Sequence, residues 1–250
     1  MKKPSGFSLI ELMIAITVGL ILVAIIAQIY VGSSQTYRTQ DDLARLQEDG
    51  RYAIESISRS LRLAGYRSDI TQAYTTSFPA TTEAIGGTEG GGSPTVPDTL
   101  IVRHYGSGGV GATGTPDNSI RDCTSTAINN ATRAQMTFSV AGGTLQCQRD
   151  AGTLVPLINN ITDLQVLYGV DTSSPTDGTV DIFQTASPTL IWDNVLVVRL
   201  CIEMQTANNN VTPSAQTYTN CSGAPVNANA GDRRFHRTFS TTIALRNRLP

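Results

Sequence analysis

The sequence predicts an α+β protein in which one long N-terminal α-helix packs on an antiparallel β-sheet. Two observations support this prediction. Residues 7–64 contain no proline and carry a largely helical pattern of apolar residues. Several later segments alternate apolar and polar residues, as strands do when only one face of their sheet is covered. A helix followed by a region rich in strands is typical of the α+β class.

Residues 7–31 are predicted to span a membrane as the first half of this helix. At ~1.5 Å per residue the segment is about 37 Å long, enough to cross a bilayer. Lys2 and Lys3 precede it, whereas cations and acids are mixed after it, so the N-terminus is expected in the cytoplasm and the rest outside. The alternatives are a cleaved secretory signal and a plain anchor. Its polar residues are Ser8, Glu11, Thr17 and Gln28.

Neither alternative accounts for Glu11. A carboxylate costs about 3 kcal/mol or more near the middle of the hydrocarbon, and less near an interface. Cleavage after Gly6 would create an ammonium group on Phe7, one helical turn from Glu11. Between neighbouring chains, the acid of one would neutralise the amine of the next and fix their axial offset. A buried pair of this kind sets register more than it adds stability.

The second half of the helix is predicted over residues 32–66, with Gly65 as its C-cap. One face is apolar or small and should lie on the sheet, with a coiled-coil dimer as the alternative. Gly50 lies on this face and is expected to cost about 1 kcal/mol relative to alanine. The residues of the face are Leu43, Leu46, Gly50, Ile54, Ile57, Leu61 and Ala64.

Residues 67–250 are predicted to form a β-rich globular domain. Two stretches rich in Gly, Thr and Pro, 75–97 and 106–118, are interpreted as long loops. The glycines at 142 and 143 predict a hairpin turn between two strands. The alternating segments that predict strands are 136–140, 145–147, 164–168, 196–204 and 235–245.

The four cysteines predict two disulfides and an oxidising compartment. None of them forms a C-x-x-C pair, and the only histidines are His104 and His236, so a zinc site is poorly supported. Cys123–Cys147 with Cys201–Cys221 is the simplest of the possible connectivities. Four buried, reduced thiols are the alternative.

No motif predicts catalysis. "GSGGVG" at 106–111 fits a dinucleotide loop, but Gly114 and Pro116 follow where a helix is needed. No G-x-S-x-G occurs. His104 and His236 are interpreted as strand or surface residues. With 18 cations and 20 anions, the net charge of −2 gives no general attraction to nucleic acid.

Two charged clusters raise weaker hypotheses. Asp171, Asp177 and Asp181 share a polar loop and are a candidate calcium site, although their spacing is not that of an EF-hand and an Asx-rich turn is favoured. Arginines make the C-terminus basic and would contact DNA phosphates or acids on a neighbouring subunit. These arginines are Arg233, Arg234, Arg237, Arg246 and Arg248.

The N-terminal "GFSLIELMIA" after two lysines resembles the class III signal of type IV pilins and of the pseudopilins of type II secretion. The resemblance implies the type IV pilin fold and cleavage by a prepilin peptidase between Gly6 and Phe7. It also implies N-methylation of Phe7 and a role in assembly for Glu11. Related pilins often hold calcium in acidic loops. The implied domains are a leader 1–6, an assembly helix 7–31, its continuation 32–66 and the globular part 67–250.

Four further stretches, 45–67, 161–172, 198–204 and 242–250, resemble PilW-like minor pilins. The resemblance implies a non-enzymatic subunit that helps initiate a type IV pilus near its tip and supports twitching motility. Implied partners are major and minor pilins, the prepilin peptidase, the inner-membrane assembly platform and membrane lipid. The protein would lie in the inner membrane with a periplasmic domain, and in the extracellular pilus after assembly.

Other functions stay open from the sequence. The first and third of these stretches also resemble the J-type minor pseudopilin of type II secretion. A pilus-tip adhesin or DNA-uptake subunit is another alternative, although contact with DNA or a host surface lacks support in the sequence. A membrane-tethered enzyme is the weakest.

Overall fold

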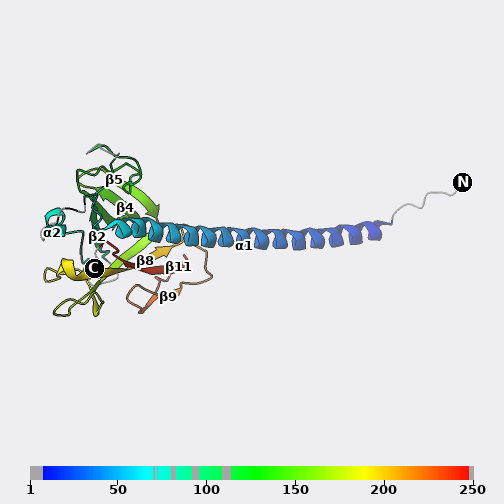
Figure 1. The fold of residues 1–250 in the computed structure, drawn as a ribbon. Coiled ribbons are helices and arrows are strands. Elements are labelled where there is room, and N and C mark those ends of the chain that lie inside the picture. Colours follow the sequence, from blue (N-terminus) through cyan, green and yellow to red (C-terminus); the bar gives the residue numbers. More distant parts are fainter. Residues whose placement is uncertain are drawn as a thin grey trace. The chain divides into compact units, whose positions relative to one another are not determined.

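A computed structural model gives the structure of the protein. It describes residues 8–69, 71, 73–79, 83–91, 96–108 and 114–247. The chain divides into two compact units, residues 1–44 and 45–250, which are described separately. Helix α1, Leu9–Leu63, begins in the first unit and ends in the second (Figure 1).

Helix α1 ends at Leu63, just before the predicted C-cap Gly65. Gly65 adopts a positive φ of 75°, the left-handed conformation that commonly ends helices and that glycine adopts without strain. The side-chain amide of Asn247 donates to the carbonyls of Arg62 and Ala64, both at 3.2 Å. These carbonyls at the helix end lack partners within the helix, so Asn247 ties the C-terminal segment to α1.

The strands form two antiparallel sheets and one short hairpin. The first sheet has the order β1-β2-β3-β4-β5, the second has the order β11-β8-β6-β7, and β9 pairs with β10. The strands are β1 Ile85–Thr88, β2 Thr99–His104, β3 Ala134–Ala141, β4 Thr144–Arg149, β5 Leu154–Asn159, β6 Ile161–Val170, β7 Ile182–Gln184, β8 Val195–Gln205, β9 Thr217–Thr219, β10 Pro225–Asn227 and β11 His236–Ala244. The short helices are α2 Tyr74–Ser77 and the 3₁₀ helix Trp192–Asn194.

The apolar face of α1 joins one core with residues of both sheets. Ile57 and Leu61 are completely buried there, and burial of each side chain stabilises the fold by about 1.5–3 kcal/mol. Gly50 also lies on this face, where the ring of Phe239 from β11 occupies the space of a side chain. The predicted packing of the helix on strands is therefore confirmed.

Residues 75–97 correct one expectation. The segment contains most of α2 and the whole of β1, so it is not one long loop. Its strand reads Ile-Gly-Gly-Thr, which lacks the apolar alternation that identifies strands. At Gly87 the absence of a side chain admits the hydroxyl of Tyr168, and this contact between sheets is invisible in the sequence.

The predicted β3–β4 hairpin is confirmed. Gly142 and Gly143 form its turn with φ values of 57° and 75°. Two successive positive φ values are those of a type I′ turn, whose twist matches that of the flanking strands.

Candidate assembly site

Glu11 and Ser8 hold the start of α1 by reciprocal hydrogen bonds. The Ser8 N–H donates to Glu11 Oε2 at 3.0 Å, and the Glu11 N–H donates to Ser8 Oγ at 3.3 Å. This is a capping box, which satisfies two amides that the helix leaves unpaired. The carboxylate also lies at the positive end of the helix dipole. The Glu11 carboxylate therefore already accepts a hydrogen bond within its own chain. Gly6 and Phe7 lie outside the described residues.

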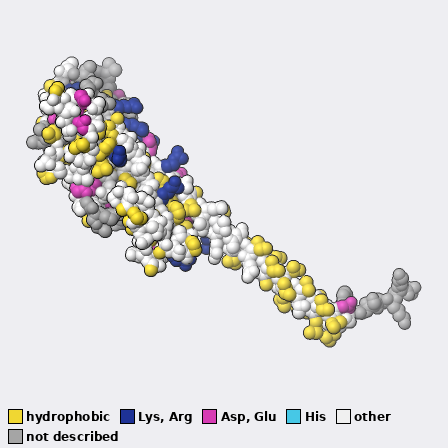
Figure 2. Space-filling model, turned by 90° about the horizontal axis from the view of Figure 1, so that it is seen from below, with side chains coloured by type: hydrophobic (Ala, Val, Ile, Leu, Met, Phe, Trp, Pro, Cys, Tyr) yellow, Lys and Arg dark blue, Asp and Glu magenta, His cyan; other side chains and the backbone are white. Residues whose placement is uncertain are grey.

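The first half of α1 exposes a continuous apolar surface. An 18-residue window has a mean hydropathy of 2.9 and none of it is buried, so the helix is long and apolar enough to cross a membrane. Figure 2 shows apolar side chains along the visible face of this helix. The large exposed side chains are Leu9, Ile10, Leu12, Met13, Ile14, Ile16, Val18, Leu20, Ile21, Leu22, Val23, Ile25, Ile26, Ile29, Tyr30 and Val31.

Thr17 is a polar residue on this surface and is satisfied locally. Its hydroxyl lies 2.9 Å from the carbonyl oxygen of Ile14 and 3.0 Å from that of Met13. A hydroxyl that donates to its own helix needs no water, so Thr17 is compatible with lipid or with packed helices.

The comparisons with known proteins identify the family. The family model described as Type IV Pilus-assembly protein W matches residues 119–247, more than half of the 250 residues. The chain belongs to this family. The model of the prokaryotic N-terminal methylation motif matches residues 1–27 of this PilW-family chain.

A solved structure supports the same fold. A type IV-like pilin from Thermus thermophilus is similar to the PilW-family chain with a TM-score of 0.51 and 10% identity. The similarity covers 81% of this chain and 98% of that one. No curated protein matches the sequence significantly. The predicted pilin resemblance and fold are confirmed, and family and fold are those of structural pilins.

Two disulfides join the four cysteines, Cys123 to Cys147 and Cys201 to Cys221. The pairing is the one between sequence neighbours, and no cysteine is free. Cys147 is buried on β4. Cys201 on β8 holds Cys221, and with it the segment that carries β9 and β10, against the second sheet.

The C-terminal arginines that the structure describes lie against different groups. Arg233 donates to the Thr212 carbonyl at 3.0 Å, and Arg234 lies 3.8 Å from Asp232. Arg237 lies over the ring of Phe239. Arg246 lines a groove, whereas Arg248 is outside the described residues.

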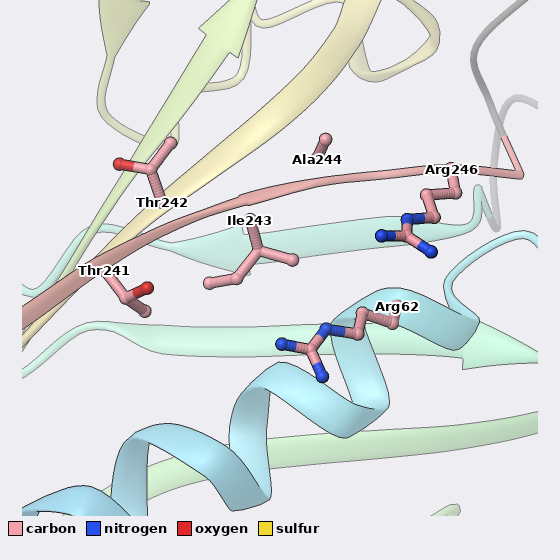
Figure 3. Close-up of a pocket in the computed structure, with 6 residues that line it drawn as sticks. All are labelled: Arg62, Thr241, Thr242, Ile243, Ala244 and Arg246. Atoms are coloured by element: carbon pink, nitrogen blue, oxygen red, sulfur yellow. The ribbon is translucent and has the colours of Figure 1, made fainter.

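The groove that contains Arg246 lies between the last turn of α1 and β11 (Figure 3). Its volume is about 190 Å³. Figure 3 shows the guanidinium groups of Arg62 and Arg246 at this space, one from the helix and one from beyond the strand. The lining residues are Arg62, Thr241, Thr242, Ile243, Ala244 and Arg246, so both charges in the lining are positive.

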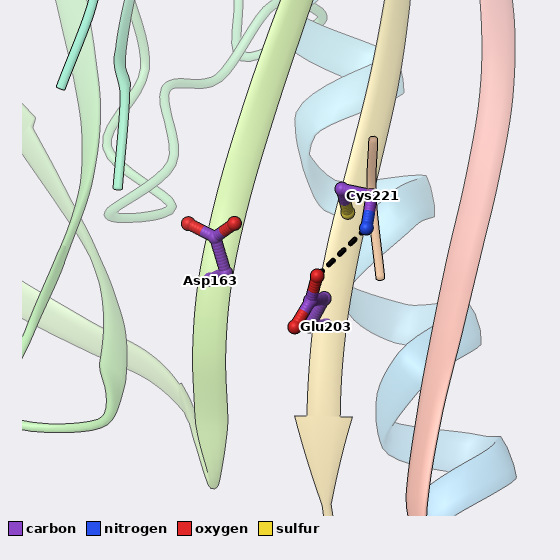
Figure 4. A group of neighbouring side chains, drawn as sticks. All are labelled: Asp163, Glu203 and Cys221. Carbon is purple, nitrogen blue, oxygen red and sulfur yellow. Dashed lines mark hydrogen bonds between the residues drawn. The ribbon is translucent and has the colours of Figure 1, made fainter. Parts of the chain in front are cut away.

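A pair of buried acids lies between β6 and β8, where the sequence analysis expected no site. Asp163 and Glu203 are cross-strand neighbours with exposures of 1% and 3% (Figure 4). Glu203 Oε1 accepts the Cys221 N–H at 2.7 Å. Asp163 Oδ1 accepts the Leu164 N–H at 2.9 Å, whereas its Oδ2 has no hydrogen-bond partner in the described part of the chain.

Burial raises the pKa of both carboxyls, and nearby negative charge adds to the effect. For Glu203 that charge is Asp163, and for Asp163 it is Glu89. One oxygen of each acid and the Cys221 sulfur lie within 4.8 Å of one another. Because that sulfur is in a disulfide, it offers no thiolate, and two carboxylates are far fewer than the six to eight oxygens that Ca²⁺ takes.

The candidate calcium loop uses its acids for its own backbone. Asp171 is buried, and its Oδ2 accepts the N–H groups of Asp177 at 2.9 Å and Gly178 at 2.7 Å. Asp181 Oδ2 accepts the N–H and the hydroxyl of Thr172. Asp171 also accepts the Ser173 N–H, and Asp177 accepts the Thr179 N–H, which are the contacts of the Asx-rich turn that the sequence favoured; calcium binding stays a prediction.

Neither histidine lies in a catalytic arrangement among the described residues. His104 is buried, which lowers the pKa of its imidazole, and its Nδ1 lies 2.8 Å from the Tyr105 carbonyl. His236 stacks on Tyr218 with ring centres 4.6 Å apart, and its Nε2 lies 3.1 Å from Asp232 Oδ2. Both serve local packing.

Proposed function

We propose that this chain is a minor type IV pilin and not an enzyme. It helps to start pilus assembly, enters the fibre near its tip and thereby supports twitching motility. The observation that supports this most directly is the exposed apolar surface of α1, which begins at Leu9, within the Ser8–Glu11 capping box. An apolar surface of this length requires lipid or other helices around it.

The proposed course begins with a precursor in the inner membrane, with its N-terminus in the cytoplasm and its domain in the periplasm. A prepilin peptidase removes residues 1–6 and methylates Phe7. On the assembly platform the 7–31 helix then moves from lipid into a bundle with other pilins, and the domain becomes extracellular. Packing of the apolar surface drives this step, and Glu11 sets the axial offset by pairing with the Phe7 ammonium of a neighbouring subunit.

Two substitutions separate the roles of Glu11. Glu11→Gln keeps the capping geometry, since glutamine also closes a capping box, but removes the charge. Ser8→Ala keeps the charge and removes one half of the box, which costs about 1 kcal/mol. We expect Glu11→Gln to be processed normally and to be lost from sheared fibres, whereas Ser8→Ala still enters them.

The measurement is mass spectrometry of the mature protein from its native host, together with its amount in sheared fibres. A methylated Phe7 at the start is the expected result. A protein that begins at Met1, or beyond Ala27, contradicts the proposal. Equal incorporation of Glu11→Gln and wild type contradicts the role of the charge. Deletion that spares fibres and twitching but abolishes export of an enzyme would instead indicate a pseudopilin.

A further inference from the structure

Strand β11 is the outermost strand of the second sheet, and part of its backbone faces outward. The Leu245 N–H donates to the Leu196 carbonyl and the Thr206 N–H to the Phe235 carbonyl, both at 2.9 Å. Hydrogen-bonded and non-bonded pairs alternate along an antiparallel ladder. Odd-numbered residues of β11 therefore bond to β8, and the N–H and C=O groups of the even-numbered ones point away from the sheet.

His236 supports this assignment. Its N–H donates to Gln216 Oε1 at 2.8 Å, and its carbonyl accepts from Gln216 Nε2 at 3.2 Å, so a side chain takes the place of a neighbouring strand. Beyond this point no strand in the described ranges pairs with the outer edge of β11. The outward backbone groups belong to Thr238, Ser240, Thr242 and Ala244.

The other sheet edges are protected against pairing and this one is not. β1 has four residues, two of them glycine, and β7 has three residues. β5 carries Pro156 and a register shift in its ladder with β4. β11 pairs with β8 over nine residues without a shift and contains neither proline nor glycine. Native proteins usually blunt exposed edges because a long regular edge templates a further strand.

The positive charge beside this edge favours an acidic partner. Arg62 and Arg246 line the groove along β11, with no acid among its lining residues. The ion-pair contact of Arg62 to Glu55 is long, at 3.9 Å, whereas Arg59 approaches the same carboxylate to 3.1 Å. Two guanidinium groups at one groove repel each other and favour an occupant that carries carboxylates.

We propose that the outer edge of β11 binds an extended, acidic segment of a neighbouring subunit in the same fibre. The segment adds as a strand beside Thr238–Ala244, its backbone pairs with the outward groups, and its carboxylates pair with Arg62 and Arg246. Main-chain bonds supply affinity in such strand addition, and the charges supply specificity. The inference rests on the proposed function, because the neighbour is a fibre subunit.

The test uses the full-length protein in its native host. A photoreactive benzoylphenylalanine replaces Ser240 on the edge, and a control replaces Leu154, which is 48% exposed on β5. We expect the probe at Ser240 to cross-link to an acidic segment of another pilin-like subunit, whereas the probe at Leu154 does not. No product at Ser240, or products with lipid alone, overturns the proposal.

Two matched variants carry the Ser240 probe. Thr242→Pro removes an outward N–H and leaves the bonds to β8 intact, whereas Thr242→Val keeps the N–H. We expect a loss of cross-linking of about tenfold or more for Thr242→Pro and little change for Thr242→Val. The double variant Arg62→Glu, Arg246→Glu should give a similar loss of cross-linking. It tests the proposal if Thr242→Pro fails to fold. Equal yields in all variants overturn the proposal.

Failure of this inference is distinguishable from failure of the proposed function. A protein that begins at methylated Phe7 and enters fibres, yet gives no product at Ser240, overturns strand addition alone. If wild type never enters fibres, there is no neighbouring subunit, and both proposals are overturned.

Discussion

Gly50 offers a test of how α1 packs on the second sheet. Alanine normally stabilises a helix interior by about 1 kcal/mol relative to glycine. At Gly50, however, a Cβ would overlap three atoms of the Phe239 ring. Overpacking of this kind costs about 1–3 kcal/mol. Because the cost of the overlap exceeds the gain in helix propensity, Gly50→Ala should lower the free energy of unfolding by up to about 2 kcal/mol.

Displacement of the ring would break its present contacts. The partly buried Phe239 ring packs against the core beside Gly50 of α1, and the Arg237 guanidinium lies over it, 5.6 Å from the ring centre. Outward rotation therefore loses the contact with the helix. In a Phe239→Ala background the overlap is gone, and Gly50→Ala should stabilise the protein by about 1 kcal/mol. The double-mutant cycle then gives a coupling of about 1–3 kcal/mol.

Urea unfolding of the soluble fragment 33–250, followed by circular dichroism, measures all four variants of the cycle. The sign of the change in unfolding free energy caused by Gly50→Ala decides whether the two residues are in contact. If Gly50→Ala stabilises the fragment with Phe239 in place as much as without it, the two residues do not touch, and the packing of α1 against β11 described above is refuted.

Two other substitutions test features of the second sheet. Since burial raises the pKa of Glu203 above its ordinary value of 4.5, the folded state retains a proton that the unfolded chain releases. Its contribution to stability is present below pH 4.5 and is lost as the pH rises through the folded-state pKa. Glu203→Gln should flatten this decline with pH and should be more stable than the wild type at pH 7. A variant that is less stable than the wild type at pH 7 argues against this effect of Glu203. The Cys201–Cys221 disulfide closes a loop with a separation of 20 residues. Replacing both cysteines with serine should lower the free energy of unfolding by about 3 kcal/mol, and a change below 1 kcal/mol in urea titrations argues against this role.

The sequence could predict what depends on local pattern. Helix α1 follows from its period and from the absence of proline, and its end follows from Gly65. The β3–β4 hairpin follows from two adjacent glycines. Ser8 carried a usable signal that was missed: serine three residues before glutamate at the start of an apolar run is the pattern of a capping box.

Long-range pairing could not be predicted in the same way. One covered sheet was expected, whereas the strands divide into two, because strand partners are set by contacts between distant segments. Asp163 and Glu203 each stand out as acids in apolar strands. Only the register of β6 on β8 places them opposite each other. The open edge of β11 likewise can be identified only from the complete strand order of its sheet.

The buried acids and Glu11 hold their carboxyl groups in different surroundings. Asp163 and Glu203 lie in the interior, where a raised pKa favours the neutral form. Glu11 instead lies exposed at a helix start, where it accepts the Ser8 N–H. In the proposed fibre, Glu11 would therefore exchange one donor, the Ser8 N–H, for another, the Phe7 ammonium of a neighbouring subunit, rather than gain its first partner. The net gain from that exchange is small, so the charge fixes the axial position of the subunit while the apolar surface of α1 supplies the driving force.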